Sequence, residues 1–222
     1  MIAVRRPGLL DYLESWRRMQ VFTERRNPLT PDEVWLLQHP PVYTLGLGGK
    51  PEHILDAGAT PVVKCDRGGQ VTYHGPGQLV VYLLLDLKRL NLGVKAMVKQ
   101  SEQALIDLLA DYGVGARRRA GAPGVYAGEA KIAALGFRVR RGCCYHGLAL
   151  NVDMDLAPFR RINPCGYAGL EVTQLKDCGV NDDVATVGEA LLPHLLQTLD
   201  LDTRVENACS SSPCYAGEMG VY

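Results

Sequence analysis

The amino-acid sequence predicts one α/β domain. Its 222 residues are 47% hydrophobic, which suits a single large core better than two small ones. Short apolar runs typical of strands alternate with segments that repeat apolar residues at helical spacing. We expect residues 1–205 to form this domain and residues 206–222, which are rich in serine, cysteine and glycine, to form a flexible tail.

Charge and cysteine content narrow the class of protein. The 24 basic and 24 acidic side chains cancel, so nothing points to a nucleic acid or a membrane surface as the main partner. The N-terminus lacks the apolar core of a signal peptide, and no run of about 18 apolar residues could span a bilayer. We therefore expect a cytoplasmic protein whose 7 cysteines are reduced thiols.

The first half of the chain predicts a helix, three strands and a second helix. The first helix carries apolar residues at spacings of three on one face and charged residues on the other. The second helix is about five turns long and ends at Gly113. The expected elements are residues 10–26 (helix), 34–38, 61–65 and 79–87 (strands) and 94–112 (helix).

The second half predicts a hairpin and a final helix. Residues 125–127 and 130–139 are typical of strands, and residues 143–152 of the hairpin partner of the second. We expect a solvated charged edge at residues 117–119, a short helix within 155–161 and a tight loop at 162–166. Thr186 and Glu189 match a capping box before a leucine-rich helix, in which Pro193 should produce a kink or shift the start.

Residues 67–82 form the segment that most favours a functional site. It brings together Arg67, Gly68, Gly69, Thr72 and His74, and then continues into an apolar strand. Glycine lets the backbone turn sharply and approach a ligand, and a strand would hold the loop rigidly. The alternative is an ordinary hairpin with a surface histidine.

A phosphate loop is excluded upstream of this segment. Residues 44–51 place Thr44 where the first glycine should be, and Pro51 follows Lys50 in place of serine or threonine. Metal-binding spacings and a Gly-x-Ser-x-Gly elbow do not occur in the sequence either.

A thiol nucleophile fits the remaining residues better. Cys165 lies in the predicted loop between Pro164 and Gly166, outside any apolar run. Cysteine reacts as the thiolate, with an ordinary pKa of about 8.5, so a nearby ammonium would favour the reactive form. Lys131 could be that cation, because it interrupts an otherwise apolar strand; the alternative is a lysine that reaches the sheet edge.

Several motifs together resemble the lipoyl(octanoyl) transferase, or LipB, family. The resemblance runs from about residue 34 to residue 175, with the motifs in family order. The matching segments are Arg67-Gly68-Gly69-x-x-Thr72-Tyr73-His74-x-x-Gly77-Gln78-x-x-x-Tyr82 and residues 39–46, 130–136, 146–152 and 163–166.

The resemblance implies a fold, a reaction and site residues. The fold would be a mixed sheet flanked by helices with a small second sheet, as in the catalytic domains of lipoate and biotin protein ligases. An octanoyl group would pass from octanoyl-acyl carrier protein to one lysine of a lipoyl domain, in the E2 subunit of a 2-oxoacid dehydrogenase or in the glycine-cleavage H protein. Cys165 would carry the acyl group and Lys131 would activate it, without ATP or metal.

The family motifs also map the expected acyl-substrate site. His146 and His39 are candidate auxiliary groups, and His74 and His146 would orient the lysine or the carbonyl, or satisfy buried hydrogen bonds. Backbone N–H groups at residues 135–136 or 68–69 could stabilise an oxyanion, and residues 79–83 and 148–150 could line an apolar tunnel. The expected substrate-binding residues are Arg67, Gly68, Gly69, Gln70, Val71, Thr72, Tyr73, His74, Ala134, Leu135, Gly136, Gly147, Leu148 and Ala149.

Two other functions remain open from the sequence. An ATP-dependent lipoate or biotin protein ligase would share the fold without needing Cys165. A module that only docks on carrier or lipoyl domains would need neither Cys165 nor Lys131. Docking on an acidic carrier protein would suit Arg138, Arg140 and Arg141, or residues 117–119.

Overall fold

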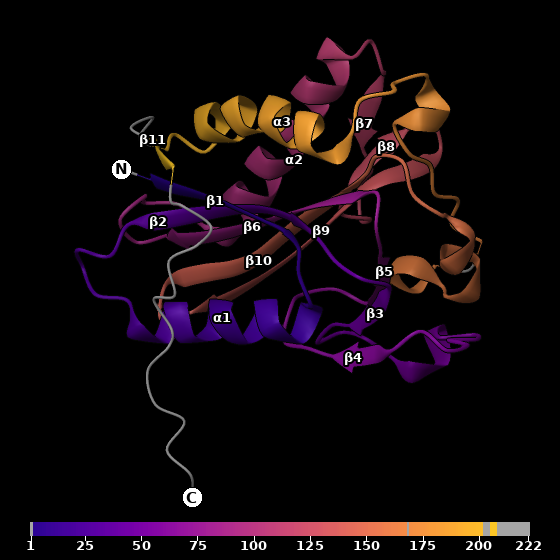
Figure 1. Ribbon diagram of the computed structural model, residues 1–222, viewed down its shortest axis with the longest axis horizontal. Helices are drawn as coiled ribbons and strands as arrows, with labels where there is room; N and C mark the ends of the chain where they lie inside the picture. Colours follow the sequence, from indigo (N-terminus) through magenta and orange to yellow (C-terminus); the bar gives the residue numbers. More distant parts are fainter. Residues whose placement is uncertain (1, 168, 202–204, 208–222) are drawn as a thin grey trace, which may run out of the picture.

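The computed structural model describes residues 2–167, 169–201 and 205–207, with the side chains of Cys165 and residues 205–207 outside that description. The strands of the described chain form two sheets (Figure 1). The strands are β1 (Ile2–Leu9), β2 (Asp32–Gln38), β3 (Val42–Leu45), β4 (Val62–Lys64), β5 (Val71–His74), β6 (Gln78–Asp86), β7 (Ala116–Arg118), β8 (Val125–Ala127), β9 (Ala130–Arg140), β10 (Cys143–Asn151) and β11 (Val205–Asn207).

Within the described residues, the larger sheet has eight strands in the order β11-β1-β2-β6-β10-β9-β8-β7. β1 runs parallel to both β11 and β2, and the other pairs are antiparallel, so the sheet is mixed. β6 lies near the centre and is buried along nearly its whole length. Its continuous apolar run suits a strand that is covered on both faces.

Helices cover both faces of this sheet (Figure 1). α2 (Val94–Asp111) and α3 (Val184–Thr198) pack together on one face, and α1 (Tyr12–Arg25) lies across the other. Short 3₁₀ turns lie in two connections: η1 (Pro51–His53) between β3 and β4, and η2 (Ala157–Arg161), η3 (Pro164–Gly166) and η4 (Lys176–Cys178) between β10 and α3.

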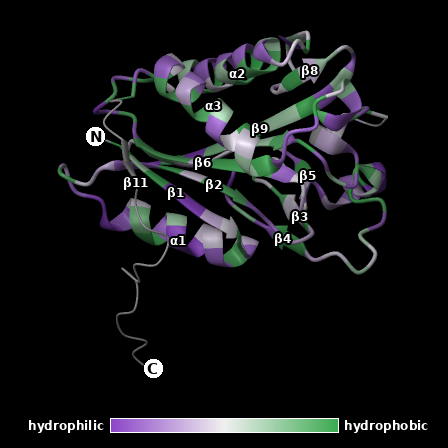
Figure 2. Ribbon diagram, turned by 45° about the horizontal axis from the view of Figure 1, so that its top comes forward, coloured by the Kyte–Doolittle hydropathy of each residue, from purple (hydrophilic) through white to green (hydrophobic). Residues whose placement is uncertain are grey.

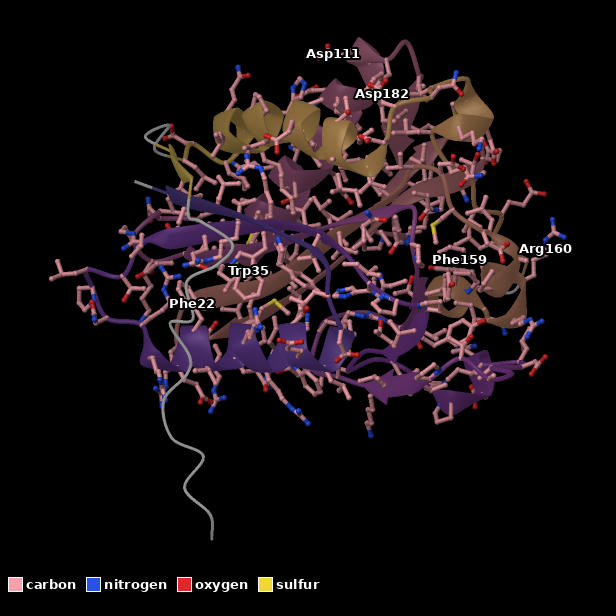
Figure 3. All side chains as sticks on the ribbon, viewed as in Figure 1. Phe22, Trp35, Asp111, Phe159, Arg160 and Asp182 are labelled. Carbon is pink, nitrogen blue, oxygen red and sulfur yellow. The ribbon has the colours of Figure 1, made fainter. Side chains whose placement is uncertain are left out.

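The core divides into layers that follow these faces. The largest apolar cluster joins β6, β9 and β10 to α2 and α3, and a second joins the opposite sheet face to α1. Hydrophobic residues follow the strands while hydrophilic ones are frequent on the helices (Figure 2). Phe22 of α1 and Trp35 of β2 lie between helix and sheet in the second cluster (Figure 3).

The smaller sheet, in the described residues, has three strands in the order β4-β3-β5. β5 leads through Gly77 into β6, and this turn requires glycine. Gly77 has a φ of +85°, and a Cβ there would lie 1.8 Å from the carbonyl oxygen of Asp153. The two sheets are therefore joined directly at the segment that the sequence favoured as a site.

The structure confirms the predicted fold class, a mixed sheet flanked by helices with a small second sheet. The predicted helices at 10–26 and 94–112, and the predicted strands at 34–38, 61–65, 79–87 and 125–127, lie within two residues of observed elements at each end. The predicted hairpin is formed by antiparallel β9 and β10. The charged run at 117–119 lies largely in the edge strand β7.

The predicted start of the last helix is wrong. α3 begins at Val184, and its N-cap is Asp183, whose carboxylate accepts the backbone N–H of Thr186. Thr186 is therefore inside the helix, and Glu189 binds Arg6 in place of closing a capping box. The helix continues through Pro193.

Five strands, β1, β3, β5, β7 and β11, were not predicted, and β11 meets the expected domain boundary. β1 contains Arg5 and Arg6, which hid its strand character, and β11 pairs with it from Val205 to Asn207. The expected boundary at residue 205 therefore falls within β11. Of the predicted flexible tail at residues 206–222, residues 206–207 lie in β11 and residues 208–222 lie outside the described residues.

Candidate functional site

A largely apolar cavity lies between β5 of the small sheet and strands β6, β9 and β10 of the large one. It contains about 520 Å³ of space not filled by atoms, its open mouth included. Its lining residues are Tyr12, Arg67, Gly69, Gln70, Val71, Thr72, His74, Val80, Tyr82, Ala134, Leu135, Gly136, His146, Gly147, Leu148 and Ala149. The structure thus brings together twelve of the fourteen residues expected to bind the acyl substrate.

Gly68 and Tyr73 are the two expected residues that do not line this cavity. The backbone N–H of Gly68 donates to the carbonyl oxygen of Phe137 at 3.0 Å, so it is not free to stabilise an oxyanion. Tyr73 points to the other side of β5, where its ring packs against Tyr43 and Phe159. Both residues therefore contact the structure around the cavity and do not face the cavity itself.

Arg67 places a buried cation at the cavity wall. Its Nε donates to Thr44 Oγ1 at 3.0 Å, and Nη2 donates to the Thr44 carbonyl oxygen at 2.6 Å and to Oγ1 at 2.8 Å. Nη1 donates to the carbonyl of Gly68 at 2.9 Å. Among the described residues, no carboxylate pairs with this guanidinium. A fixed positive charge in an apolar cavity suits a ligand group that carries or develops negative charge.

His74 and His39 are buried and neutral at physiological pH. His74 Nδ1 donates to Gln78 Oε1 at 2.7 Å, and burial together with the neighbouring His39 lowers the pKa of His74 to about 3. His39 Nδ1 donates to the Leu10 carbonyl at 2.6 Å, so Nε2 accepts the hydroxyl of Tyr82 at 2.6 Å; burial lowers the pKa of His39 to about 4. The surface-histidine alternative is therefore wrong for His74. His39 does not line the cavity but contacts its lining residues Tyr82, Tyr12 and His74.

His146 is held by a partly buried acidic group, the carboxylate of Asp66. Its Nε2 donates to Asp66 Oδ1 at 2.9 Å, and Asp66 also accepts hydrogen bonds from Trp16 and Tyr145. Burial opposes ionisation of Asp66, but these hydrogen bonds outweigh it and hold the Asp66 pKa well below its ordinary value. Burial also lowers the pKa of His146 in spite of the carboxylate. His146 thus presents a fixed neutral ring to the cavity.

Sequence reasoning missed Tyr12 as a lining residue. Its hydroxyl is buried and has no hydrogen-bond partner among the described residues, and its ring stacks on His74 with centroids 5.9 Å apart. The expected apolar stripe of α1 began at Leu13, which is exposed, whereas the buried face of the helix begins at Tyr12 and continues through Met19. Tyr82 was visible only as the last member of the motif that begins at Arg67.

Lys131 is held inside the protein, so the alternative of a lysine that reaches the sheet edge is wrong. The residue is 4% exposed, and its Nζ lies 5.5 Å from the centre of the Tyr126 ring. It lines a smaller cavity together with Thr72, Ala134 and Ala149, which also line the larger one. The two cavities are therefore adjacent, with Lys131 at the second.

The backbone brings the Cys165 loop to the same place. Pro164, which directly precedes Cys165 in η3, lines the smaller cavity with Lys131. Asn163 donates its backbone N–H to the carbonyl of His53 at 2.8 Å, which fixes the loop to η1. The side chain of Cys165 lies outside the described part of the structure, so the chain path alone places this residue beside the cavity of Lys131.

Other site classes receive no support from the described residues. These contain no cluster of three or more potential metal ligands and no helix long and apolar enough to cross a membrane. Cys65, Cys143, Cys144 and Cys178 are free thiols.

Comparison with known proteins identifies the family. The family model of the lipoyl protein ligase A/B catalytic domain matches residues 11–196. An octanoyltransferase of Azoarcus sp. (strain BH72) is 64% identical over 200 residues, covering 89% of this chain and 88% of the relative. An octanoyltransferase of Dechloromonas aromatica (strain RCB) is 62% identical over 197 residues, covering 89% and 96%.

Solved structures support the same fold. A bi-partite lipoate protein ligase from Thermoplasma acidophilum superposes with a TM-score of 0.71 at 18% identity, covering 94% of this chain and 88% of that one. Biotin protein ligase from Aquifex aeolicus, in complex with biotin and ATP, gives a TM-score of 0.57 at 14% identity, covering 90% and 70%. The chain therefore belongs to the lipoyl protein ligase A/B catalytic-domain family and, within it, to the octanoyltransferases.

Proposed function

We propose that the chain transfers an octanoyl group from octanoyl-acyl carrier protein to a lysine of lipoyl domains, through a thioester on Cys165 that Lys131 assists. Eight relatives between 57% and 64% identical all bear the name octanoyltransferase, which confirms the predicted acyltransferase class and octanoyl transfer in protein lipoylation. The roles of individual residues, the partners and the absence of a cofactor are part of the proposal.

The observation that carries the residue assignment is the burial of Lys131 beside the acyl cavity. A lysine is rarely buried without a specific task, because removing its charge from water costs several kcal/mol. Here Lys131 lines a cavity with Pro164, the neighbour of Cys165, and that cavity adjoins the apolar one. An ammonium at this place would favour the Cys165 thiolate.

In the first step, the Cys165 thiolate would attack the thioester carbonyl of the incoming octanoyl group. A carbon–sulfur bond forms to Cys165, the bond to the pantetheine sulfur breaks, and the Lys131 ammonium gives its proton to the leaving thiolate. The octanoyl tail would occupy the apolar cavity lined by Val80, Leu135 and Leu148.

In the second step, the acceptor lysine would attack the Cys165 thioester as a neutral amine. A carbon–nitrogen bond forms, the carbon–sulfur bond breaks, and the amine proton passes to neutral Lys131, which restores the ammonium and the thiolate. Conversion of a thioester into an amide is downhill, so we propose that neither ATP nor a metal ion takes part.

Two kinds of protein partner follow from this chemistry: an acyl carrier protein as donor, and lipoyl domains of 2-oxoacid dehydrogenase E2 subunits and of the glycine-cleavage H protein as acceptors. Some of the arginines considered for docking are already paired, since Arg117 and Arg119 contact Glu129 and Arg140 contacts Glu24. Arg141 is exposed on the turn between β9 and β10 and is the better candidate for an acidic carrier surface.

The test is the intact mass of the protein after mixing with octanoyl-acyl carrier protein in the absence of ATP. We expect an added octanoyl mass that maps to Cys165 and is discharged by a lipoyl domain. Cys165→Ser should lose turnover while keeping the fold, whereas Cys143→Ser, which alters a free thiol elsewhere, should form the adduct normally. Transfer that needs ATP and free octanoate, with no adduct, would support the ligase alternative.

Lys131→Ala provides the second arm of the test. If Lys131 favours the thiolate, its loss should raise the pH at which Cys165 is alkylated and should slow transfer. An unchanged alkylation profile would refute the role of Lys131 while leaving the thioester intermediate standing.

A further inference from the structure

Gly124, at the start of β8, lies against the end of the Lys131 side chain. A Cβ at position 124 would be 2.3 Å from Lys131 Cε and 3.0 Å from Nζ, and 2.8 Å from the carbonyl oxygen of Ala133. Atoms at these separations overlap, so any larger residue must displace both the lysine side chain and the Ala133 carbonyl. The bare Cα of Gly124 thus leaves the space that the ammonium end occupies.

A buried carboxylate on α2 holds Gly124 in this place. Glu102 is 6% exposed, and its Oε1 accepts the backbone N–H of Gly124 at 2.9 Å. Its other oxygen accepts Arg118 Nε at 3.1 Å, and Arg118 Nη2 also donates to the carbonyl of Lys99 on α2 at 2.8 Å. Glu102 therefore ties the start of β8 and the end of β7 to the same helix.

The backbone of Lys131 is fixed independently from the other side. Its N–H donates to the carbonyl of Glu171 at 2.8 Å, and its carbonyl accepts the N–H of Thr173 at 2.9 Å. The β8–β9 register shifts between Val125 and Tyr126, opposite Lys131, and such irregularities redirect side chains next to active sites. With the backbone held, Gly124 and the Tyr126 ring confine where the ammonium can lie.

We propose that Glu102 and Gly124 are positioning residues for the transfer reaction: Glu102 fixes Gly124, and Gly124 sets the location of the Lys131 ammonium beside the Cys165 loop. The inference rests on the proposed role of Lys131. A displacement of a reacting group by about 1 Å can lower the rate about 10²-fold, so a small contact remote from the substrate can control turnover.

The direct test is Gly124→Ala. We expect kcat to fall about 10- to 100-fold while KM for the octanoyl carrier stays within about twofold, because the acyl cavity is untouched. The pH profile of Cys165 alkylation should shift in the same direction as in Lys131→Ala. A defect of folding alone would lower the amount of active protein without moving that profile.

Two glycines nearby provide matched controls. Gly124 has a positive φ of +134°, and Gly128 has one of +58°, but a Cβ on Gly128 would meet no atom within 4 Å, so Gly128→Ala tests an alanine at a positive φ without the collision. Gly115 has neither a positive φ nor a close neighbour, so Gly115→Ala reproduces the added methyl group alone. Both variants should keep the wild-type alkylation profile and kcat.

Glu102 offers a second variant pair in case Gly124→Ala does not fold. Glu102→Ala removes the acceptor of the Gly124 N–H and should lower kcat about 10-fold and shift the alkylation profile. Glu102→Gln keeps a carbonyl acceptor for the Gly124 N–H but not the second acceptor for Arg118, so it should recover part of kcat and part of the alkylation profile. Equal behaviour of the two variants would overturn the positioning role of Glu102.

The outcomes separate this inference from the function on which it rests. If Lys131→Ala alkylates and turns over like the wild type, the role of Lys131 is refuted, and the positioning role with it. If Lys131→Ala is impaired while Gly124→Ala behaves like Gly128→Ala, only the positioning role is overturned.

Discussion

Arg67 and Thr44 are joined by three hydrogen bonds, from Nε and Nη2 of the guanidinium to the hydroxyl and the carbonyl of the threonine. Thr44 belongs to β3 of the small sheet, and Arg67 lines the acyl cavity. The pair thus uses the small sheet to hold a charge at a fixed point in an apolar environment. A hydrogen bond to a charged group contributes about 1.5 to 3 kcal/mol to the free energy of unfolding.

Replacing Thr44 by valine should therefore destabilise the protein and impair transfer. Thr44→Val keeps the shape of the side chain but removes the hydroxyl that accepts from Arg67, leaving part of a buried cation unsatisfied. We expect a loss of about 1 to 3 kcal/mol in the free energy of unfolding, measured by urea denaturation, and a fall of about 10-fold or more in kcat/KM.

Thr23→Val is the control for this substitution. The Thr23 hydroxyl is buried and has no hydrogen-bond partner among the described residues, so its removal should be neutral or stabilising. Equal losses in the two variants would mean that the Arg67 contact contributes nothing specific.

Acidification should destabilise the fold through its buried histidines. His39 titrates at a pKa of about 4 in the folded protein against 6.5 when exposed, so the unfolded chain binds more protons between these values. The stabilisation that the folded protein gains by keeping His39 neutral is present above about pH 6.5 and is lost as the pH falls toward 4. His74, with a pKa of about 3, acts in the same direction, and Asp66 follows below about pH 4.

The measurement is the urea midpoint at pH 7.5 and at pH 5. Each of the two histidines should contribute about 1 to 2 kcal/mol to the loss in the free energy of unfolding between pH 7.5 and pH 5. His39→Gln keeps a side chain able to hydrogen-bond to Leu10 and Tyr82 but cannot titrate, so its loss on acidification should be smaller by that amount. A variant as acid-sensitive as the wild type would show that His39 is not the titrating group.

The parts of the fold that the sequence predicted correctly are those with local signals. The β9–β10 hairpin and α2 have a periodicity that can be read within one segment, and the structure agrees with it. β1 was missed because Arg5 and Arg6 interrupt its apolar pattern, and their charges are balanced by Glu33 and Glu189, which are distant in sequence. Long-range pairing of this kind leaves no periodic trace.

The candidate site also combines residues with a local sequence signal and residues without one. The motif residues gathered at the cavity, and Thr44 of the motif at residues 39–46 holds Arg67 there, but Asp66 and Tyr12, which also hold or complete the site, came from positions with no motif of their own. Similarly, Asp183 caps α3 through its own carboxylate, although Thr186 gave the stronger local pattern. Which of two plausible caps is used depends on where the preceding chain enters the helix.

Gly147 should not tolerate a side chain, since β10 and β6 approach closely at this point. A Cβ at position 147 would lie 1.8 Å from the carbonyl oxygen of Val81, a backbone atom that cannot move without distorting the central sheet. We expect Gly147→Ala to lower the free energy of unfolding by about 1 to 3 kcal/mol or more, measured by thermal or urea denaturation. Gly115→Ala, which adds the same methyl group to open space, should have little effect, and similar losses in both would refute the steric argument.

Ala134 should control the length of acyl chain that the cavity accepts. It is half-buried on β9 and lines both the apolar cavity and the smaller cavity of Lys131, so a longer side chain there would extend into the space proposed for the acyl group. We expect Ala134→Leu to lower octanoyl transfer about 10-fold or more while hexanoyl and butanoyl transfer change less, because shorter chains need less of the cavity. The measurement is the rate of acyl-adduct formation by intact mass with carrier proteins bearing each chain.

Ala96→Leu serves as the comparison, because Ala96 is exposed on α2 and lines neither cavity. It should leave all three rates unchanged. If Ala134→Leu slowed the three acyl chains by the same factor, the substitution would be acting on the thioester chemistry at Lys131 and not on the space for the tail. The octanoyl chain would then have to extend through a part of the cavity that Ala134 does not border.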